Sequence, residues 1–159
     1  MIYCKQLREF VIRPVLHDLG KYSRNAEELL LLTAAQESGL GKYLHQLGDG
    51  PAVGIFQMEP ATHDDIWNNF LKYKPTLGNT ILRWEMPRAF TDNNAKEMAG
   101  NLYYAVAMAR CFYLRFYESL PEHDDVVGMA RYYKKYWNTE DGAATVEEAI
   151  ENYNKYVVQ

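Results

Sequence analysis

Half of the ten glycines of the chain fall in one short window, and this cluster constrains the fold more than any other feature. They are Gly39, Gly41, Gly48, Gly50 and Gly54. Glycine destabilises the interior of a helix and permits backbone conformations that other residues avoid. The window 39–54 is therefore predicted to be a loop or a tight hairpin, with strand character limited to about residues 52–57.

Helical patterns fill most of the chain on both sides of this window. Asn25, followed by Glu28, has the cap and acidic residue that open a helix, which should end near Gly39. Pro60 suits the first turn of the next helix. From residue 95 to about 117 the pattern is apolar on more than half of a helical circumference, which predicts a central buried helix.

The remaining segments complete a mainly α chain with one small hairpin. A short helix is expected to end at Gly20, and Asp124 or Asp125 can cap a helix that runs through Tyr133. Thr145 and the acidic residues after it form a capping box for the last helix. Residues 75–92 show no clear pattern and are expected to be irregular.

Length and charge favour a single domain over residues 1–159. Of the 159 residues, 48% are hydrophobic, which is enough for one core. The formal charge of -4 disfavours a nucleic-acid partner, and no apolar run approaches the roughly 18 residues of a membrane span. Charged residues from Lys5 to Glu9 replace the apolar block of a secretory signal peptide, so none is expected.

Glu37 is the strongest candidate for chemistry. On a helix that starts near residue 26, it shares a face with Leu29, Leu30 and Thr33. It also falls in the last turn, where the negative end of the helix dipole disfavours an anion. Burial and dipole would both raise its pKa, as a general acid requires. The alternative is an acidic side chain at a frayed helix end, turned to solvent.

Two motifs resemble those of the lytic transglycosylase and goose-type lysozyme superfamily. The first is Glu37-Ser38-Gly39, and the second, after the glycine-rich window, is Gly54-Ile55-Phe56-Gln57-Met58. The resemblance covers about residues 25–137 and implies a lysozyme-like α+β fold. It also implies that Ser38, Gly54, Gln57 and Met58 contribute to substrate binding.

Further positions are similar to the goose-type pattern. Asp49, between two glycines, lies where those enzymes have an Asp-containing loop, and Glu59 with His63 has the spacing of their Asp and His. The resemblance implies a second catalytic carboxylate at Asp49 or Glu59 and a supporting role for His63. Read singly, Asp49 is a good turn residue, Glu59 a helix-start acid and His63 a packed histidine.

A tyrosine of the site is implied near the C-terminus. Ala130-Arg131-Tyr132-Tyr133 resembles an Ala-x-Tyr-Asn-Ala-Gly segment, but Tyr133 and Lys134 replace Asn and Ala, and no Gly follows. The sequence leaves open whether Tyr132 or Tyr133 faces the site. The segments 133–138 and 145–153 look like variants of phage-encoded members.

The resemblance implies a peptidoglycan-cleaving glycosidase that acts on the β-1,4 bond between N-acetylmuramic acid and N-acetylglucosamine without a cofactor. Glu37 would be the general acid, in either hydrolysis or transglycosylation to 1,6-anhydromuramic ends. The partners implied are bacterial peptidoglycan and other virion proteins, with delivery by a phage particle or lysis machinery. The alternative is a non-catalytic glycan-binding or structural virion domain with the same fold.

The sequence lacks the motifs of other kinds of catalytic or binding site. Four isolated histidines and two distant cysteines give no metal-ligand spacing, so no metal site is expected. The sequence also lacks a P-loop and a Gly-x-Ser-x-Gly nucleophile elbow.

Overall fold

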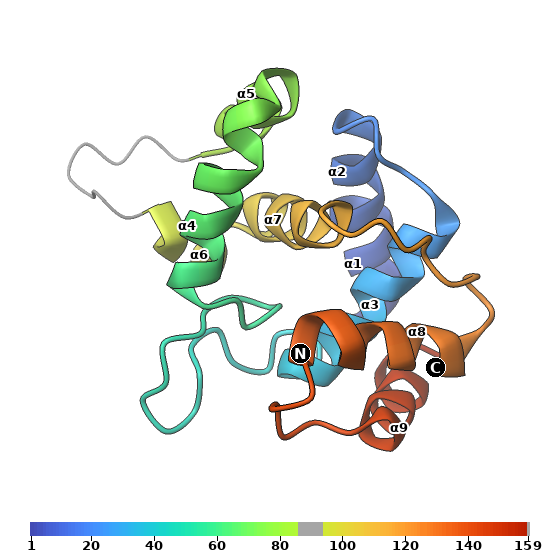
Figure 1. The fold of residues 1–159 in the computed structure, drawn as a ribbon. Coiled ribbons are helices and arrows are strands. Elements are labelled where there is room, and N and C mark those ends of the chain that lie inside the picture. Colours follow the sequence, from blue (N-terminus) through green and yellow to red (C-terminus); the bar gives the residue numbers. More distant parts are fainter. Residues whose placement is uncertain (86–93, 159) are drawn as a thin grey trace.

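The structure, a computed structural model, describes residues 1–85 and 94–158 and is a mainly α single domain (Figure 1). The structure thus confirms that the fold class is mainly α. The helical elements are α1 (Cys4–Leu7), η1 (Arg8–Ile12), α2 (Arg13–Asp18), α3 (Arg24–Ser38), α4 (Pro60–Asn69), η2 (Leu71–Tyr73), α5 (Pro75–Leu82), η3 (Asn94–Lys96), α6 (Glu97–Gly100), α7 (Leu102–Leu114), α8 (Val126–Tyr133), η4 (Lys134–Asn138) and α9 (Val146–Tyr156).

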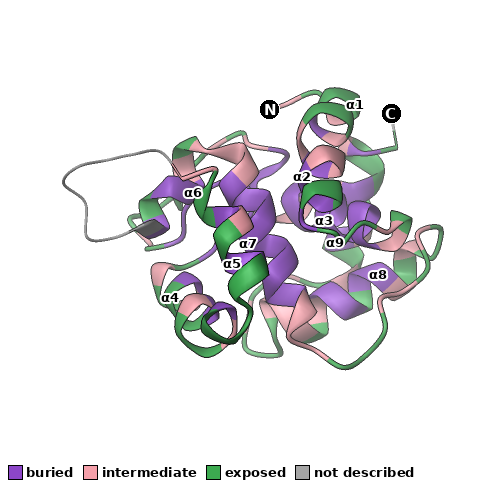
Figure 2. Cartoon of the chain, turned by 90° about the horizontal axis from the view of Figure 1, so that it is seen from above, coloured by how far each residue is buried: buried purple, intermediate pink, exposed green. Residues whose placement is uncertain are grey.

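Two helices, α3 and α7, form the centre of the molecule (Figure 2). Eleven of the fifteen residues of α3 and ten of the thirteen residues of α7 are buried. Their buried hydroxyls meet, because Thr33 Oγ1 and Tyr113 Oη lie 2.9 Å apart. The predicted central helix is present but shorter than expected, since Asn101 interrupts it and caps α7 through the backbone N–H of Tyr104 at 3.1 Å.

The ends of α3 are fixed by specific caps. Ser23, not the predicted Asn25, caps its N-terminus by accepting a hydrogen bond from the Ala26 N–H at 3.0 Å. The side chain of Asn25 instead accepts a bond from the backbone N–H of His123 at 2.8 Å. At the other end Gly39 takes the left-handed conformation, with φ 57°, that ends many helices.

A cluster of charged side chains joins the N-terminal helices to α3. Arg8 and Arg13 both donate to the buried carboxylate of Glu27, at 2.8 Å in each case, and Arg8 also pairs with Glu28. Burial opposes the ionisation of Glu27, but the hydrogen bonds from Arg13 and Arg8 outweigh it and lower its pKa. The N-terminal segment is therefore held against the first turns of α3.

The glycine-rich window forms a loop without strands, so the predicted hairpin is wrong in that respect. Within the described ranges only two isolated antiparallel bridges occur, His45 with Val53 and Val53 with Met58. Positive φ angles at Gly54 and Gln57 reverse the direction of the chain, so each bridge is limited to a single pair of residues. A ladder therefore cannot extend along this segment.

The expectation of an irregular segment over residues 75–92 is wrong for its first part. Pro75 opens α5, which continues to Leu82 and buries Leu77 and Ile81. These two residues stand four apart and share one helix face, which is too short a pattern to be distinctive in the sequence. Residues 86–92 lie outside the described part of the chain.

The lengths of the helices also bear on whether the chain could span a membrane. Among the residues that the structure describes, no helix is both long enough and apolar enough to span a bilayer.

The close packing of the loop against α6 gives a stability prediction. A Cβ at Gly54 would overlap the backbone oxygen of Met98, and φ there is +80°. Gly54→Ala should therefore lower the free energy of unfolding by about 3 kcal/mol or more, through strain and overlap together.

Gly48 is the matched control, because it has the same φ of +80° but nothing within 4 Å of an added Cβ. Gly48→Ala should cost only about 1 kcal/mol, the backbone strain alone. Urea unfolding of both variants measures the difference. Equal losses in the two would contradict the close contact with Met98.

Candidate functional site

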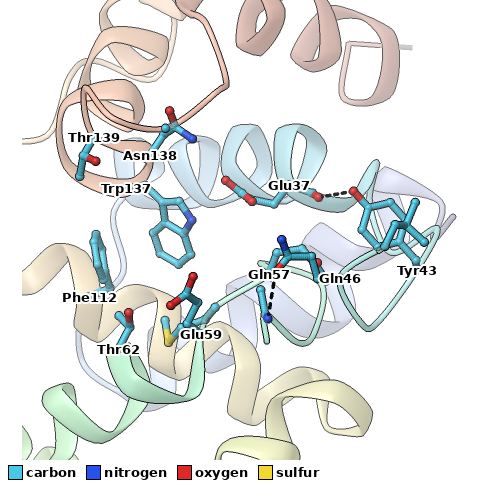
Figure 3. A pocket seen from close by; sticks show the side chains of 14 residues that line it. Glu37, Tyr43, Gln46, Gln57, Glu59, Thr62, Phe112, Trp137, Asn138 and Thr139 are labelled. Carbon is cyan, nitrogen blue, oxygen red and sulfur yellow. Dashed lines mark hydrogen bonds between the residues drawn. The ribbon is translucent and has the colours of Figure 1, made fainter. Parts of the chain in front are cut away.

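A cleft of about 620 Å³ opens between the end of α3, the glycine-rich loop, the start of α4 and the turn after η4 (Figure 3). Segments far apart in the sequence meet there. The described residues that line it are Glu37, Tyr43, Gln46, Leu47, Ala52, Gln57, Met58, Glu59, Thr62, Phe112, Trp137, Asn138, Thr139 and Gly142.

Glu37 stands in the last turn of α3 with its carboxyl group directed into this cleft (Figure 3). Burial raises the pKa of Glu37 to about 7. The alternative of an end residue turned to solvent is thus not what the structure has. At neutral pH this carboxyl group is therefore protonated in a large fraction of the molecules.

Tyr133 is the tyrosine that contacts this carboxyl group. Its hydroxyl donates a hydrogen bond to Oε1 of Glu37 at 2.5 Å. This bond favours the ionised form and so partly offsets the effect of burial on the pKa of Glu37. Tyr132 instead donates to the backbone oxygen of Glu118 at 2.9 Å, so the choice that the sequence left open falls on Tyr133.

Two further hydrogen bonds fix the backbone around Glu37. The hydroxyl of Tyr43 donates to the backbone oxygen of Glu37 at 2.8 Å (Figure 3). The buried hydroxyl of Ser38 donates to the Ile55 oxygen at 2.6 Å and accepts from the Gly41 N–H at 2.8 Å. Ser38, predicted to bind substrate, lies outside the cleft lining and ties the end of α3 to the loop.

The two candidates for a second carboxylate are separated by the structure. Glu59 precedes α4 at its N-cap position and lines the cleft, where Figure 3 shows its carboxyl group on the wall opposite Glu37. Asp49 is exposed in the loop, with φ 63°, and is not among the lining residues. The cleft thus brings together Glu37 and Glu59 but not Asp49.

The second motif contributes two residues to the cleft. Gln57 and Met58 line it, and the Gln57 side chain donates from Nε2 to the Gly54 oxygen at 2.9 Å. Gly54 is buried and is not among the lining residues, and its lack of a side chain allows close contact with Met98. Its part is to shape the loop that presents Gln57.

His63 is buried and is not among the residues that line the cleft. Its Nε2 atom is 2.7 Å from the hydroxyl of Tyr104, and its Nδ1 atom is 2.8 Å from a carboxylate oxygen of Asp64. Burial lowers the pKa of His63 despite the bond to Asp64. Its bond to Tyr104 joins α4 to α7, and the implied role of His63 in the site stays a prediction.

Sequence reasoning missed part of the cleft wall. Trp137, Phe112, Tyr43, Gln46, Thr62 and Asn138 all line it. The one signal that could have found Trp137 is its spacing of four residues from Tyr133, which places both aromatic side chains on one helix face. Tyr43 and Gln46 lie in a loop, where no periodicity marks them.

The described residues hold no cluster of three or more His, Cys, Asp or Glu side chains that could bind a metal ion.

Comparison of the chain with protein-family models, with curated proteins and with solved structures found no match.

The hydrogen bond from Tyr133 leads to a prediction about titration. Tyr133→Phe removes a donor that stabilises the Glu37 carboxylate, so the pKa of Glu37 should rise above its value of about 7. Tyr132→Phe, whose hydroxyl contacts Glu118, should leave that pKa unchanged.

Carbon-13 NMR titration of the glutamate carboxyl groups measures the effect, with the Glu37 signal assigned by its absence in Glu37→Gln. A pKa of Glu37 that falls or stays constant in Tyr133→Phe would show that this bond does not control the carboxyl group.

Proposed function

We propose that this chain is a peptidoglycan-cleaving glycosidase with a lysozyme-like fold, and that Glu37 is its general acid. The observation that carries the proposal is a half-buried carboxyl group with a pKa of about 7 that faces a cleft and is held by Tyr133. The motifs around Glu37 and Gln57, which resemble those of lytic transglycosylases and goose-type lysozymes, support the same assignment.

The chemistry follows from the proton of Glu37. Cleavage of a β-1,4 bond needs a proton at the leaving oxygen as the C–O bond breaks, and a protonated carboxyl group at the cleft wall supplies it. Oε1 is occupied by the Tyr133 hydroxyl, whereas Oε2 has no hydrogen-bond partner among the described residues. Oε2 is therefore the atom that delivers the proton.

The identity of the attacking group depends on Glu59. In hydrolysis a second carboxylate activates water on the far side of the sugar ring, and Glu59 faces the cleft from the wall opposite Glu37 (Figure 3). We therefore assign hydrolysis as the reaction, with Glu59 as the base. In the alternative reaction, the muramyl 6-hydroxyl attacks, Glu37 acts as both acid and base, and the products carry 1,6-anhydro ends.

The proposed substrate sets the place of action. The enzyme acts on the bacterial cell wall, to which a phage particle or its lysis machinery would bring it, and other virion proteins are then further partners. The alternative proposal, a non-catalytic glycan-binding or structural virion domain, predicts the same binding without bond cleavage.

Replacing the acid tests the enzyme proposal. Glu37→Gln keeps the volume of the side chain but has no acidic proton, so release of soluble muropeptides from purified peptidoglycan should fall about 10²-fold or more. Glu9→Gln, at an exposed glutamate, is the control and should keep full activity. Wild-type rates in Glu37→Gln, with an unchanged melting temperature, would remove Glu37 from the mechanism.

The second carboxylate is tested by the products. Glu59→Gln should lose most activity, Asp49→Asn should keep it because Asp49 lies outside the cleft lining, and wild-type products should carry reducing muramic ends. Mass spectrometry after borohydride treatment distinguishes these ends from anhydro ends. Dominant anhydro products with an active Glu59→Gln variant would assign the chain to the transglycosylases.

A further inference from the structure

Trp137 projects into the cleft from η4, four residues after the tyrosine that holds Glu37 (Figure 3). It is half-buried, so part of its indole surface is open. The chain has three tryptophans, and Trp137 is the one among the residues that line this cleft.

The indole ring is held in place by aromatic neighbours. Ring centroids of Phe112, Tyr113 and Phe56 lie 4.5, 5.4 and 6.3 Å from that of Trp137. Tyr113 is itself fixed to α3 through its bond to Thr33. A ring packed in this way presents a rigid apolar surface, so little side-chain freedom is lost when a ligand stacks on it.

The N–H group of Trp137 is also available. It has no hydrogen-bond partner among the described residues, in contrast to the N–H of Trp67, which donates to the Tyr104 hydroxyl at 2.9 Å. No buried side-chain nitrogen or oxygen in the described part of the chain lacks a partner. The Trp137 N–H is therefore accessible from the cleft and can donate to a ligand.

The charge of the cleft limits what that ligand can be. The described lining residues include two carboxyl groups, Glu37 and Glu59, and neither lysine nor arginine. An anionic group would meet no compensating charge there. Neutral donors and acceptors are present instead, on Gln46, Gln57 and Asn138.

We propose that Trp137 is the sugar-binding platform of this cleft, on which one N-acetylhexosamine ring stacks while the indole N–H donates to a hydroxyl or acetamido oxygen. An N-acetylhexosamine has the required chemistry, because it is uncharged, has an apolar C–H face and carries polar groups at its edge. The inference rests on the proposed function and names the residue that holds its substrate.

The test is a binding experiment that needs no turnover. Tetra-N-acetylchitotetraose is titrated into Glu37→Gln, which cannot cleave it, and the three indole N–H signals are followed by nitrogen-15 NMR. Each signal is assigned by its loss in a Trp→Phe variant at 67, 84 or 137. The Trp137 signal should shift on binding, while those of Trp67 and Trp84 should stay in place.

Affinity gives a second readout in the same background. Trp137→Leu removes the ring and should weaken binding about tenfold or more, while Trp137→Phe keeps a ring and should lose less. Trp84→Phe, at a site outside the cleft lining, should bind like its parent. If Trp137→Leu does not fold, the shift of the Trp137 signal decides alone.

The outcomes separate this inference from the proposed function. Binding by Glu37→Gln with an unmoved Trp137 signal, or with equal affinity in a folded Trp137→Leu, would overturn the platform and leave the glycosidase proposal intact. Absence of any binding would also overturn the platform. Failure of the wild-type chain to release muropeptides would instead remove the proposed function.

Discussion

The burial of α3 along most of its length is the constraint on which the rest of the structure depends. Its first turn is held by the arginines of the N-terminal helices, its middle packs on α7, and its last turn is tied to the loop by Ser38 and Tyr43. A helix fixed at both ends and in the middle cannot rotate without breaking these contacts. The direction of Glu37 is therefore set by the packed core together with the loop contacts of Ser38 and Tyr43.

Two opposing effects determine the protonation of Glu37. Burial raises its pKa, and the hydroxyl of Tyr133 lowers it, with a net value of about 7. Because the folded-state pKa lies above the unfolded value of about 4.3, the stability that this group contributes is fully present below pH 4 and is lost as the pH rises through 7. At about 1.36 kcal/mol for each pKa unit, the loss can reach about 4 kcal/mol. The fold thus tolerates an unfavourable ionised group at one position, which is typical of a site shaped for proton transfer.

The sequence predicted the parts of the fold that local rules govern. The mainly α class, the end of α3 at Gly39, the start of α4 at Pro60 and the capping box at Thr145 follow from caps, glycines and periodicity, and the structure has all of them. Placement of Glu37 on the buried face of its helix was also predictable, because spacing alone defines a helix face. The short α5 and the break at Asn101 were missed, since a two-residue apolar pattern and a single cap residue are weak signals.

Only part of the site could be predicted, because the site is assembled from distant segments whose proximity in space is not visible in the sequence. The sequence offered Glu59 and Asp49 as alternatives for the second carboxylate; both are exposed, and only the path of the loop places Glu59 in the cleft lining and Asp49 outside it. The most direct measurement of the central claim, that Glu37 is the proton donor, is the pH profile of muropeptide release at constant ionic strength. Activity should fall on the basic side with a midpoint near the Glu37 pKa of about 7. Activity that still rises past about pH 8 would contradict the account, because the protonated carboxyl group is then depleted.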